Sequence, residues 1–284
     1  MAAVNHQGIF LTNNQKGNFI MNDQHFYFGN PDTQRFNDIL TLLSRTNPSS
    51  ACTSSLPLAQ FWCPKYKSFT RKFISALPDV DFGNAQKCFE HPTPAESNSK
   101  ILTESMTDLM ILDTTCKNRI AIEAKFTEYV KDDGYNPSID KWSRTAKNSY
   151  VKNIWFDYIK RHNCTALKSL SPDLERKLPY QFLHRTASAC FDPNMSPILV
   201  YQIFYEDYEK AKSFALLLRN CAENLKLINM KFLICFVKTE FRRPLTTMEI
   251  EQPSELFITL KRERIFSFKD IEIHDVPMSD AIRA

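Results

Sequence analysis

Asp108, Glu123 and Lys125 bring two carboxylates and one amine together within one short stretch of the chain. The residues between the two acids include a polar turn, and a hairpin symmetric about the Thr115–Cys116 bond would place Asp108 opposite Glu123. Residues opposed in this way have Cβ atoms roughly 5 Å apart on one face of a sheet. Two carboxylates at that separation repel unless they are neutralised, commonly by a hard divalent cation. Without a bulge to shift the register, the pattern predicts a metal site.

Two short strands must position these side chains. Residues 109–112 form an apolar run and residues 119–126 alternate, which predicts the strands of a hairpin. Because successive side chains point to opposite faces, Glu123 and Lys125 share one face with Ala121. The carboxylate and the amine therefore stand side by side. The alternative is a solvated charge pair with no chemical role.

An Asp, a turn and then Glu-x-Lys at the end of an apolar strand resembles the signature of the PD-(D/E)XK phosphodiesterase superfamily, the restriction-endonuclease-like nucleases. Thr107-Asp108 stands at the Pro-Asp position of that signature, without its proline, and Glu123-Ala-Lys125 stands at the (Asp/Glu)-x-Lys position. The resemblance implies that Asp108 and Glu123 hold Mg²⁺, for which Mn²⁺ can substitute, and that Lys125 orients the attacking water. It also implies a further upstream acid, either Glu104 or Glu90.

Residues 178–190 are expected to form a helix that opens with a proline near its first turn. Gln181, His184 and Arg185 recur at successive-turn spacing and would form one polar ridge. Some bacterial families of the resembled superfamily have a similar Tyr-Gln-x-x-His-Arg-Thr-Ala-Ser helix, which implies that the ridge contacts phosphate above the metal. The alternative is that Gln181 and His184 are structural hydrogen-bonding residues.

A second helix is expected over residues 140–161, with basic side chains that include Lys147. A basic segment next to a catalytic hairpin is a suitable place for a polyanion, because lysine and arginine supply the sequence-independent part of nucleic-acid affinity. Lys147 is therefore a candidate nucleic-acid-binding residue. The aromatic residues Trp142 and Trp155 are expected in the core.

The remaining pattern predicts an α/β fold with a mixed central β-sheet flanked by helices, as in the restriction-endonuclease-like nucleases. Continuous apolar runs at residues 197–205 and 231–238 predict buried strands, and the amphipathic segment 207–227 between them predicts a parallel crossover helix. Helices are also expected at 31–45 and 56–77, an irregular segment at 78–100, and two closing strands after residue 241. This divides the chain into an N-terminal arm and helical decoration (1–55), a nuclease-like core (56–240) and a C-terminal β extension (241–284).

Composition places the 284 residues in an ordinary soluble class, with a formal net charge of +4 that is compatible with nucleic acid. The eight cysteines include no closely spaced pair, which favours reduced thiols and a cytoplasmic location over a disulfide framework. No apolar run reaches the length of a bilayer, so no membrane partner is expected.

The expected function is a Mg²⁺-dependent nuclease that cleaves DNA, of a restriction or genome-defence type, with RNA as an alternative substrate. A homodimer is compatible with this expectation. A non-catalytic nucleic-acid-binding or assembly protein on the same scaffold is the alternative function. A metal-free structural domain with surface charge pairs is a third, and it predicts carboxylates that point apart.

Overall fold

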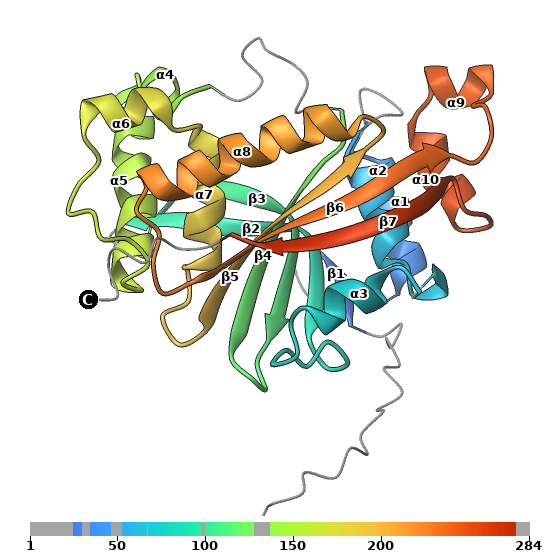
Figure 1. The fold of residues 1–284 in the computed structure, drawn as a ribbon, viewed down its shortest axis with the longest axis horizontal. Helices are drawn as coiled ribbons and strands as arrows, with labels where there is room; N and C mark the ends of the chain where they lie inside the picture. The colour runs from blue at the N-terminus through green and yellow to red at the C-terminus, as the bar shows by residue number, and fades with distance from the viewer. Residues whose placement is uncertain are drawn as a thin grey trace, which may run out of the picture.

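The computed structural model describes residues 25–29, 35–46, 53–66, 68–97, 100–127 and 137–276. These residues form one seven-stranded sheet in which the spatial order of the strands follows the chain (Figure 1). The strands are β1 (Phe26–Phe28), β2 (Gln86–Ser97), β3 (Lys100–Asp113), β4 (Asn118–Lys125), β5 (Ser196–Tyr205), β6 (Lys231–Phe241) and β7 (Phe266–Asp275).

The sheet is mixed, which confirms the predicted fold class. Strands β2, β3 and β4 form an antiparallel meander. Strand β5 pairs in parallel with β4, and β6 pairs in parallel with β5. Strand β7 pairs antiparallel with β6 at the end of the sheet. The parallel β5–β6 pair with a helix between them agrees with the predicted crossover. The short β1 pairs in parallel with β2.

Helices cover both faces of the sheet, and each face has its own hydrophobic core (Figure 1). The first core packs under α1 (Phe36–Ser44), α2 (Ser55–Trp62), α3 (Thr70–Ser75) and α10 (Ser254–Leu260). The second packs under α4 (Ile139–Trp142), α5 (Ala146–Arg161), α6 (Pro172–Lys177), α7 (Tyr180–Ala189) and α8 (Tyr208–Asn224). The short α9 (Thr247–Glu251) precedes α10.

Four expectations about the elements were wrong. Residues 78–100 contain the twelve-residue strand β2 rather than an irregular segment. The expected helix at 56–77 is divided into α2, a short 3₁₀ helix (Pro64–Tyr66) and α3, because Cys63 precedes a proline and takes an extended conformation. The helix expected at 140–161 is divided into α4 and α5 by a new cap at Thr145. After residue 241 the described residues, which end at 276, hold α9, α10 and one strand, where two strands were expected.

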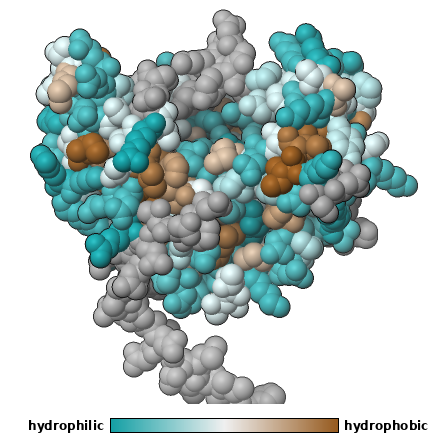
Figure 2. Space-filling view, turned by 180° about the vertical axis from the view of Figure 1, so that it is seen from behind, coloured by the Kyte–Doolittle hydropathy of each residue, from teal (hydrophilic) through white to brown (hydrophobic). Residues whose placement is uncertain are grey.

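Hydrophilic residues cover most of the face seen in Figure 2, and hydrophobic residues appear there in separate small patches. No helix in the described ranges is long and apolar enough to cross a membrane. Residues 1–24, in the expected N-terminal arm, and residues 128–136 lie outside the described residues.

Candidate active site

The hairpin of β3 and β4 has the register that the turn symmetry predicts. Leu109 pairs with Ile122, so the next position along the two strands places Asp108 opposite Glu123. The Asp108 carboxylate reaches across the hairpin, where its Oδ2 accepts a hydrogen bond of 2.7 Å from the backbone N–H of Ala124. The two carboxylates therefore belong to one site.

Glu123 and Lys125 lie on the same face of β4, toward the second core, with Ala121. The Lys125 Nζ donates to Glu123 Oε1 at 2.6 Å, and both side chains are almost fully buried. The other carboxylate oxygen, Oε2, accepts from Nε of Arg185 on α7. Glu123 thus pairs with two cations, and the alternation predicted from the sequence is confirmed.

The pKa values of the two opposed acids are shifted in opposite directions. Burial works to raise the pKa of Glu123, but Arg185 and Lys125 outweigh it and hold this pKa below the usual value. Burial, and then the nearby Glu123 charge, raise the pKa of Asp108 well above its usual range. Nη2 of Arg185 is 3.9 Å from Asp108 Oδ1, too far for a good hydrogen bond. Asp108 also keeps 19% of its side-chain surface exposed, so its charge is the less compensated of the two.

A third acid approaches the pair from β2. Glu90 lies between Phe89 and His91, which pair with Leu109 and Thr107 of β3. The position of Glu90 on β2 is therefore opposite Asp108 on β3. Burial and the Glu123 charge raise the Glu90 pKa to about 7, although Arg185 lowers it. The backbone of Glu90 has φ +48°, a left-handed conformation that is uncommon outside glycine and that clusters at functional sites. Three strands therefore present acids in one row.

Glu104 is not part of that row. It is exposed on β3, four residues before Asp108, which corresponds to roughly 13 Å along a strand. Of the two upstream acids considered from the sequence, Glu90 is the one that the structure brings to Asp108 and Glu123.

The predicted ridge on α7 points into the protein rather than toward solvent. His184 and Arg185 are both buried, and Arg185 Nη1 donates to Ser105 Oγ at 2.9 Å. The Ser105 hydroxyl in turn lies in hydrogen-bond contact with Nδ1 of His184. Sequence reasoning missed Ser105, because nothing in its neighbourhood distinguishes it from any other serine on a strand.

Aromatic rings enclose His184. Tyr180 and Trp155 each stack on it with ring centroids 5.0 Å apart, and Trp142 stacks on both of those rings. Trp142 and Trp155 therefore pack inside, as expected. Gln181 lies half-buried one turn before His184, and its Oε1 has no hydrogen-bond partner among the residues that the structure describes. Lys147 is exposed on the first turn of α5, outside the carboxylate cluster.

The donor set fits a magnesium ion held by two protein ligands. In the described part of the chain, no three acidic, histidine or cysteine side chains form a metal-binding group. Mg²⁺ commonly binds through one or two carboxylates and completes its shell with water and substrate phosphate. The under-compensated carboxylate of Asp108, next to Glu123, is a suitable anchor for such an ion. Zinc, which prefers nitrogen and sulfur ligands in a closed tetrahedral site, is not suited to this set.

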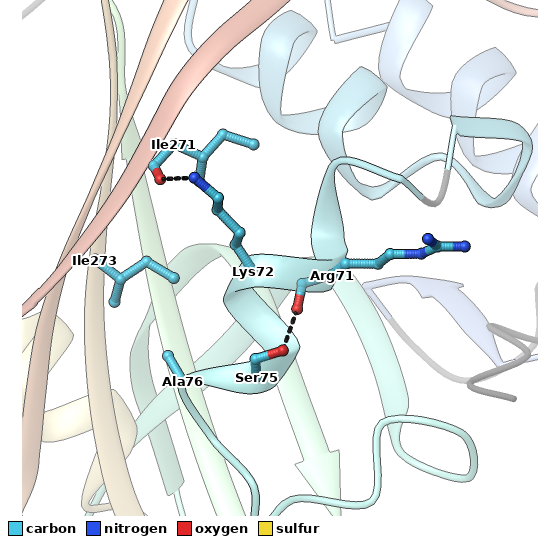
Figure 3. A pocket seen from close by; sticks show the side chains of 6 residues that line it. All are labelled: Arg71, Lys72, Ser75, Ala76, Ile271 and Ile273. Carbon is cyan, nitrogen blue, oxygen red and sulfur yellow. Dashed lines mark hydrogen bonds between the residues drawn. The ribbon is translucent and has the colours of Figure 1, made fainter. Parts of the chain in front are cut away.

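A separate pocket of about 430 Å³ lies between α3 and β7 (Figure 3). It is next to the first core, on the other face of the sheet from Arg185. Lys72 on its wall donates to the backbone carbonyl of Ile271 at 3.2 Å. The lining contains no carboxylate, so the pocket lacks the groups that a metal site needs; the lining residues are Arg71, Lys72, Ser75, Ala76, Ile271 and Ile273.

Comparison with known proteins gives one match. The model of a family described as a domain of unknown function, DUF6946, matches residues 32–232. This range spans β2 to β5 and therefore includes the three acids, Lys125 and the α7 helix. Neither the curated proteins nor the solved structures include a match.

Proposed function

The chain belongs to the DUF6946 family, and we propose that it is a Mg²⁺-dependent nuclease that hydrolyses phosphodiester bonds in DNA. The observation that carries this proposal is the convergence of Asp108, Glu123 and Lys125 at one end of the β3–β4 hairpin. The same residues carry the resemblance to the PD-(D/E)XK signature. The mixed sheet, with its hairpin followed by parallel strands, is the scaffold that this resemblance leads one to expect.

Asp108 and Glu123 are the residues that would hold the ion. When bound, Mg²⁺ would supply a Lewis acid that lowers the pKa of a coordinated water and stabilises charge on phosphate oxygens. Lys125 Nζ, held by its contact with Glu123, would supply a positive charge to an attacking water and a phosphate at this site. Arg185 balances the Glu123 charge from the helix side, which leaves Asp108 as the carboxylate with free coordinating capacity.

A polyanion would approach along the basic start of the α4–α5 region. Lys141, Arg144 and Lys147 are all exposed there, and Lys147 belongs to α5, which packs against α7. Exposed cations in this region would neutralise phosphates on the polyanion near the scissile one. We propose DNA as the substrate, in a restriction or genome-defence role in the cytoplasm, with a homodimer as the natural assembly for a two-stranded cut.

The test is incubation with plasmid, linear duplex, single-stranded DNA and RNA, each with Mg²⁺, with Mn²⁺ and with chelator. We expect metal-dependent cleavage of DNA that is lost in Asp108→Asn and in Lys125→Met. Glu104→Gln, which removes an exposed acid on the same strand, is the control and should cleave normally. Activity that persists in both site variants would refute the assignment.

The second candidate is a non-catalytic nucleic-acid-binding or assembly protein. The observation that favours it is the burial of the Glu123–Lys125–Arg185 cluster, in which two cations already neutralise one acid. Such a cluster can be purely structural, and a buried pair is by itself weak evidence of either stability or function. Titration with Mn²⁺ separates the two functions, because a scaffold without chemistry has no need to bind the ion.

A further inference from the structure

Arg185 uses each of its three nitrogens differently. Its Nε pairs with Glu123 on β4, its Nη1 donates to Ser105 on β3 at 2.9 Å, and its Nη2 stops 3.9 Å from Asp108. The guanidinium is planar and rigid, so two fixed nitrogens determine where the third one points. The contact with Ser105 therefore sets the distance between Arg185 and Asp108.

The protons in this cluster can be assigned from the hydrogen bonds. Arginine has only donors, so Ser105 Oγ accepts from Arg185. The single hydroxyl proton of Ser105 is then free to be donated to Nδ1 of His184. Arg185 Nη1 also approaches Nδ1, at 3.4 Å, and it too can only donate. Nδ1 as the acceptor fits these three contacts and puts the proton of His184 on Nε2, a buried atom with no hydrogen-bond partner among the described residues.

The surroundings of His184 keep its ring uncharged and fixed in position. Burial, followed by the charges of Arg185 and Lys125, keeps the pKa of His184 well below its usual range, so the ring is neutral. Tyr180 and Trp155 stack on the ring and fix its plane. The Ser105 hydroxyl is therefore held between a fixed acceptor and a fixed donor.

We propose that Ser105 is a positioning residue that directs Arg185 toward Glu123 and away from Asp108, so that Asp108 remains available to a divalent cation. This rests on the proposed function, in which Asp108 holds the ion. Without the hydroxyl, Nη1 loses the acceptor at 2.9 Å and keeps the longer 3.4 Å contact with Nδ1 of His184. Rotation of the guanidinium toward Asp108 then gains a charge-assisted hydrogen bond. Arg185 would then occupy the carboxylate that the ion needs.

The first measurement is calorimetric titration of Mn²⁺ into the full-length wild type and three variants. Ser105→Ala should weaken binding by about tenfold or more, the usual effect of losing a residue that orients a metal ligand. Ser105→Thr keeps the hydroxyl and should restore most of the affinity. Ser188→Ala is the matched control, because its buried hydroxyl on α7 donates to the backbone carbonyl of His184. Mn²⁺ affinity in Ser105→Ala equal to that of the wild type would overturn the role of Ser105.

The second measurement needs no metal. Nitrogen-15 NMR of the metal-free protein, with His184 assigned by comparison with His184→Gln, should show Nε2 protonated and Nδ1 accepting a hydrogen bond. In Ser105→Ala the Nδ1 signal should shift toward that of a non-bonded nitrogen, and in Ser188→Ala it should not. A His184 protonated on Nδ1 would overturn the proposal about Ser105 alone. Failure of the wild type to bind Mn²⁺ would instead refute the proposed function and, with it, the reason for positioning Arg185.

Discussion

Asp108 and Glu123 are chemically similar, yet their environments separate them. Glu123 is enclosed by Lys125 and Arg185, which stabilise its charge. Asp108 accepts a hydrogen bond from the backbone N–H of Ala124, and the guanidinium of Arg185 stays 3.9 Å from its carboxylate. An acid with a lowered pKa next to one with a raised pKa is the kind of arrangement in which the two can have different roles. Here the arrangement leaves the Glu123 carboxylate paired with two cations and the charged form of Asp108 less well compensated.

Glu90 gives a prediction about pH and stability. Its pKa is raised to about 7 in the folded protein from an ordinary value of 4.5. An acid whose pKa is raised by folding contributes stability below its unfolded pKa and loses it as the pH rises through the folded pKa. Glu90→Gln should therefore become more stable than the wild type as the pH rises from about 5 to 8, by roughly 3 kcal/mol at most.

Urea denaturation at a series of pH values checks this difference. Glu104→Gln is the matched control for the loss of one negative charge, because Glu104 is exposed on the neighbouring strand. Wild-type and Glu90→Gln stabilities that run parallel from pH 5 to 8 would contradict the account of Glu90.

At the scale of elements, the β3–β4 hairpin was predictable because its turn is symmetric, its first strand is an apolar run and its second strand alternates. Strand β2 was not, because Pro92 and Pro94 argue against a strand. The described part of β1 pairs only with Lys87, Cys88 and Phe89, so both prolines lie where that side of β2 has no partner from β1. A proline is tolerated on an edge of this kind, since it has no N–H to leave unpaired.

The contacts of the site were less predictable than its strands. Glu123 and Arg185 are 62 residues apart in the chain, and no local pattern joins them. The spacing of Gln181, His184 and Arg185 indicated a ridge, but only the packing of α7 on the sheet shows that two of them are buried. The start of α9 did have a local signal in the sequence, because Thr246 and Glu249 form the capping box that begins this helix.

The link between α2 and β7 gives a prediction at this scale. The buried Gln60 donates to the carbonyl of Phe266 at 2.8 Å and accepts from the N–H groups of Ile265 and Phe266. Gln60→Ala leaves these three buried backbone groups unpaired, so we expect a loss of about 3 kcal/mol of unfolding free energy. Hydrogen exchange should also become faster at the start of β7.

Urea denaturation measures the loss, and Gln252→Ala at an exposed position is its control. A decrease no larger than that of the control would show that other contacts hold β7 in place.

At the scale of the whole molecule, the net charge of +4 is small, so any attraction for DNA must come from the local arrangement of cations. The exposed side chains of Lys141, Arg144 and Lys147 lie in the α4–α5 region that packs with α7. Arg71 is exposed on α3, which packs on the opposite face of the sheet. The two faces can therefore be compared by matched substitutions.

Lys147→Glu should weaken DNA binding several-fold and reduce the dependence of log affinity on log salt by about one to two units, because phosphate contacts set that slope. Arg71→Glu makes the same change of charge on the other face and should leave both quantities near the wild-type values. Fluorescence anisotropy with a labelled duplex, at several salt concentrations and in chelator, measures them. Equal effects of the two substitutions would show that DNA does not approach along α5.

The central claim is that Asp108 and Glu123 together bind a divalent cation, and calorimetric titration of Mn²⁺ into wild type and Asp108→Asn tests it most directly. The amide oxygen that this substitution introduces can still accept the hydrogen bond from Ala124, so the variant removes the charge while keeping the contact that positions the side chain. We expect Mn²⁺ binding by the wild type that is lost in Asp108→Asn, with Glu104→Gln unchanged. A wild type that binds no Mn²⁺, or an Asp108→Asn variant that binds it equally well, would contradict the claim.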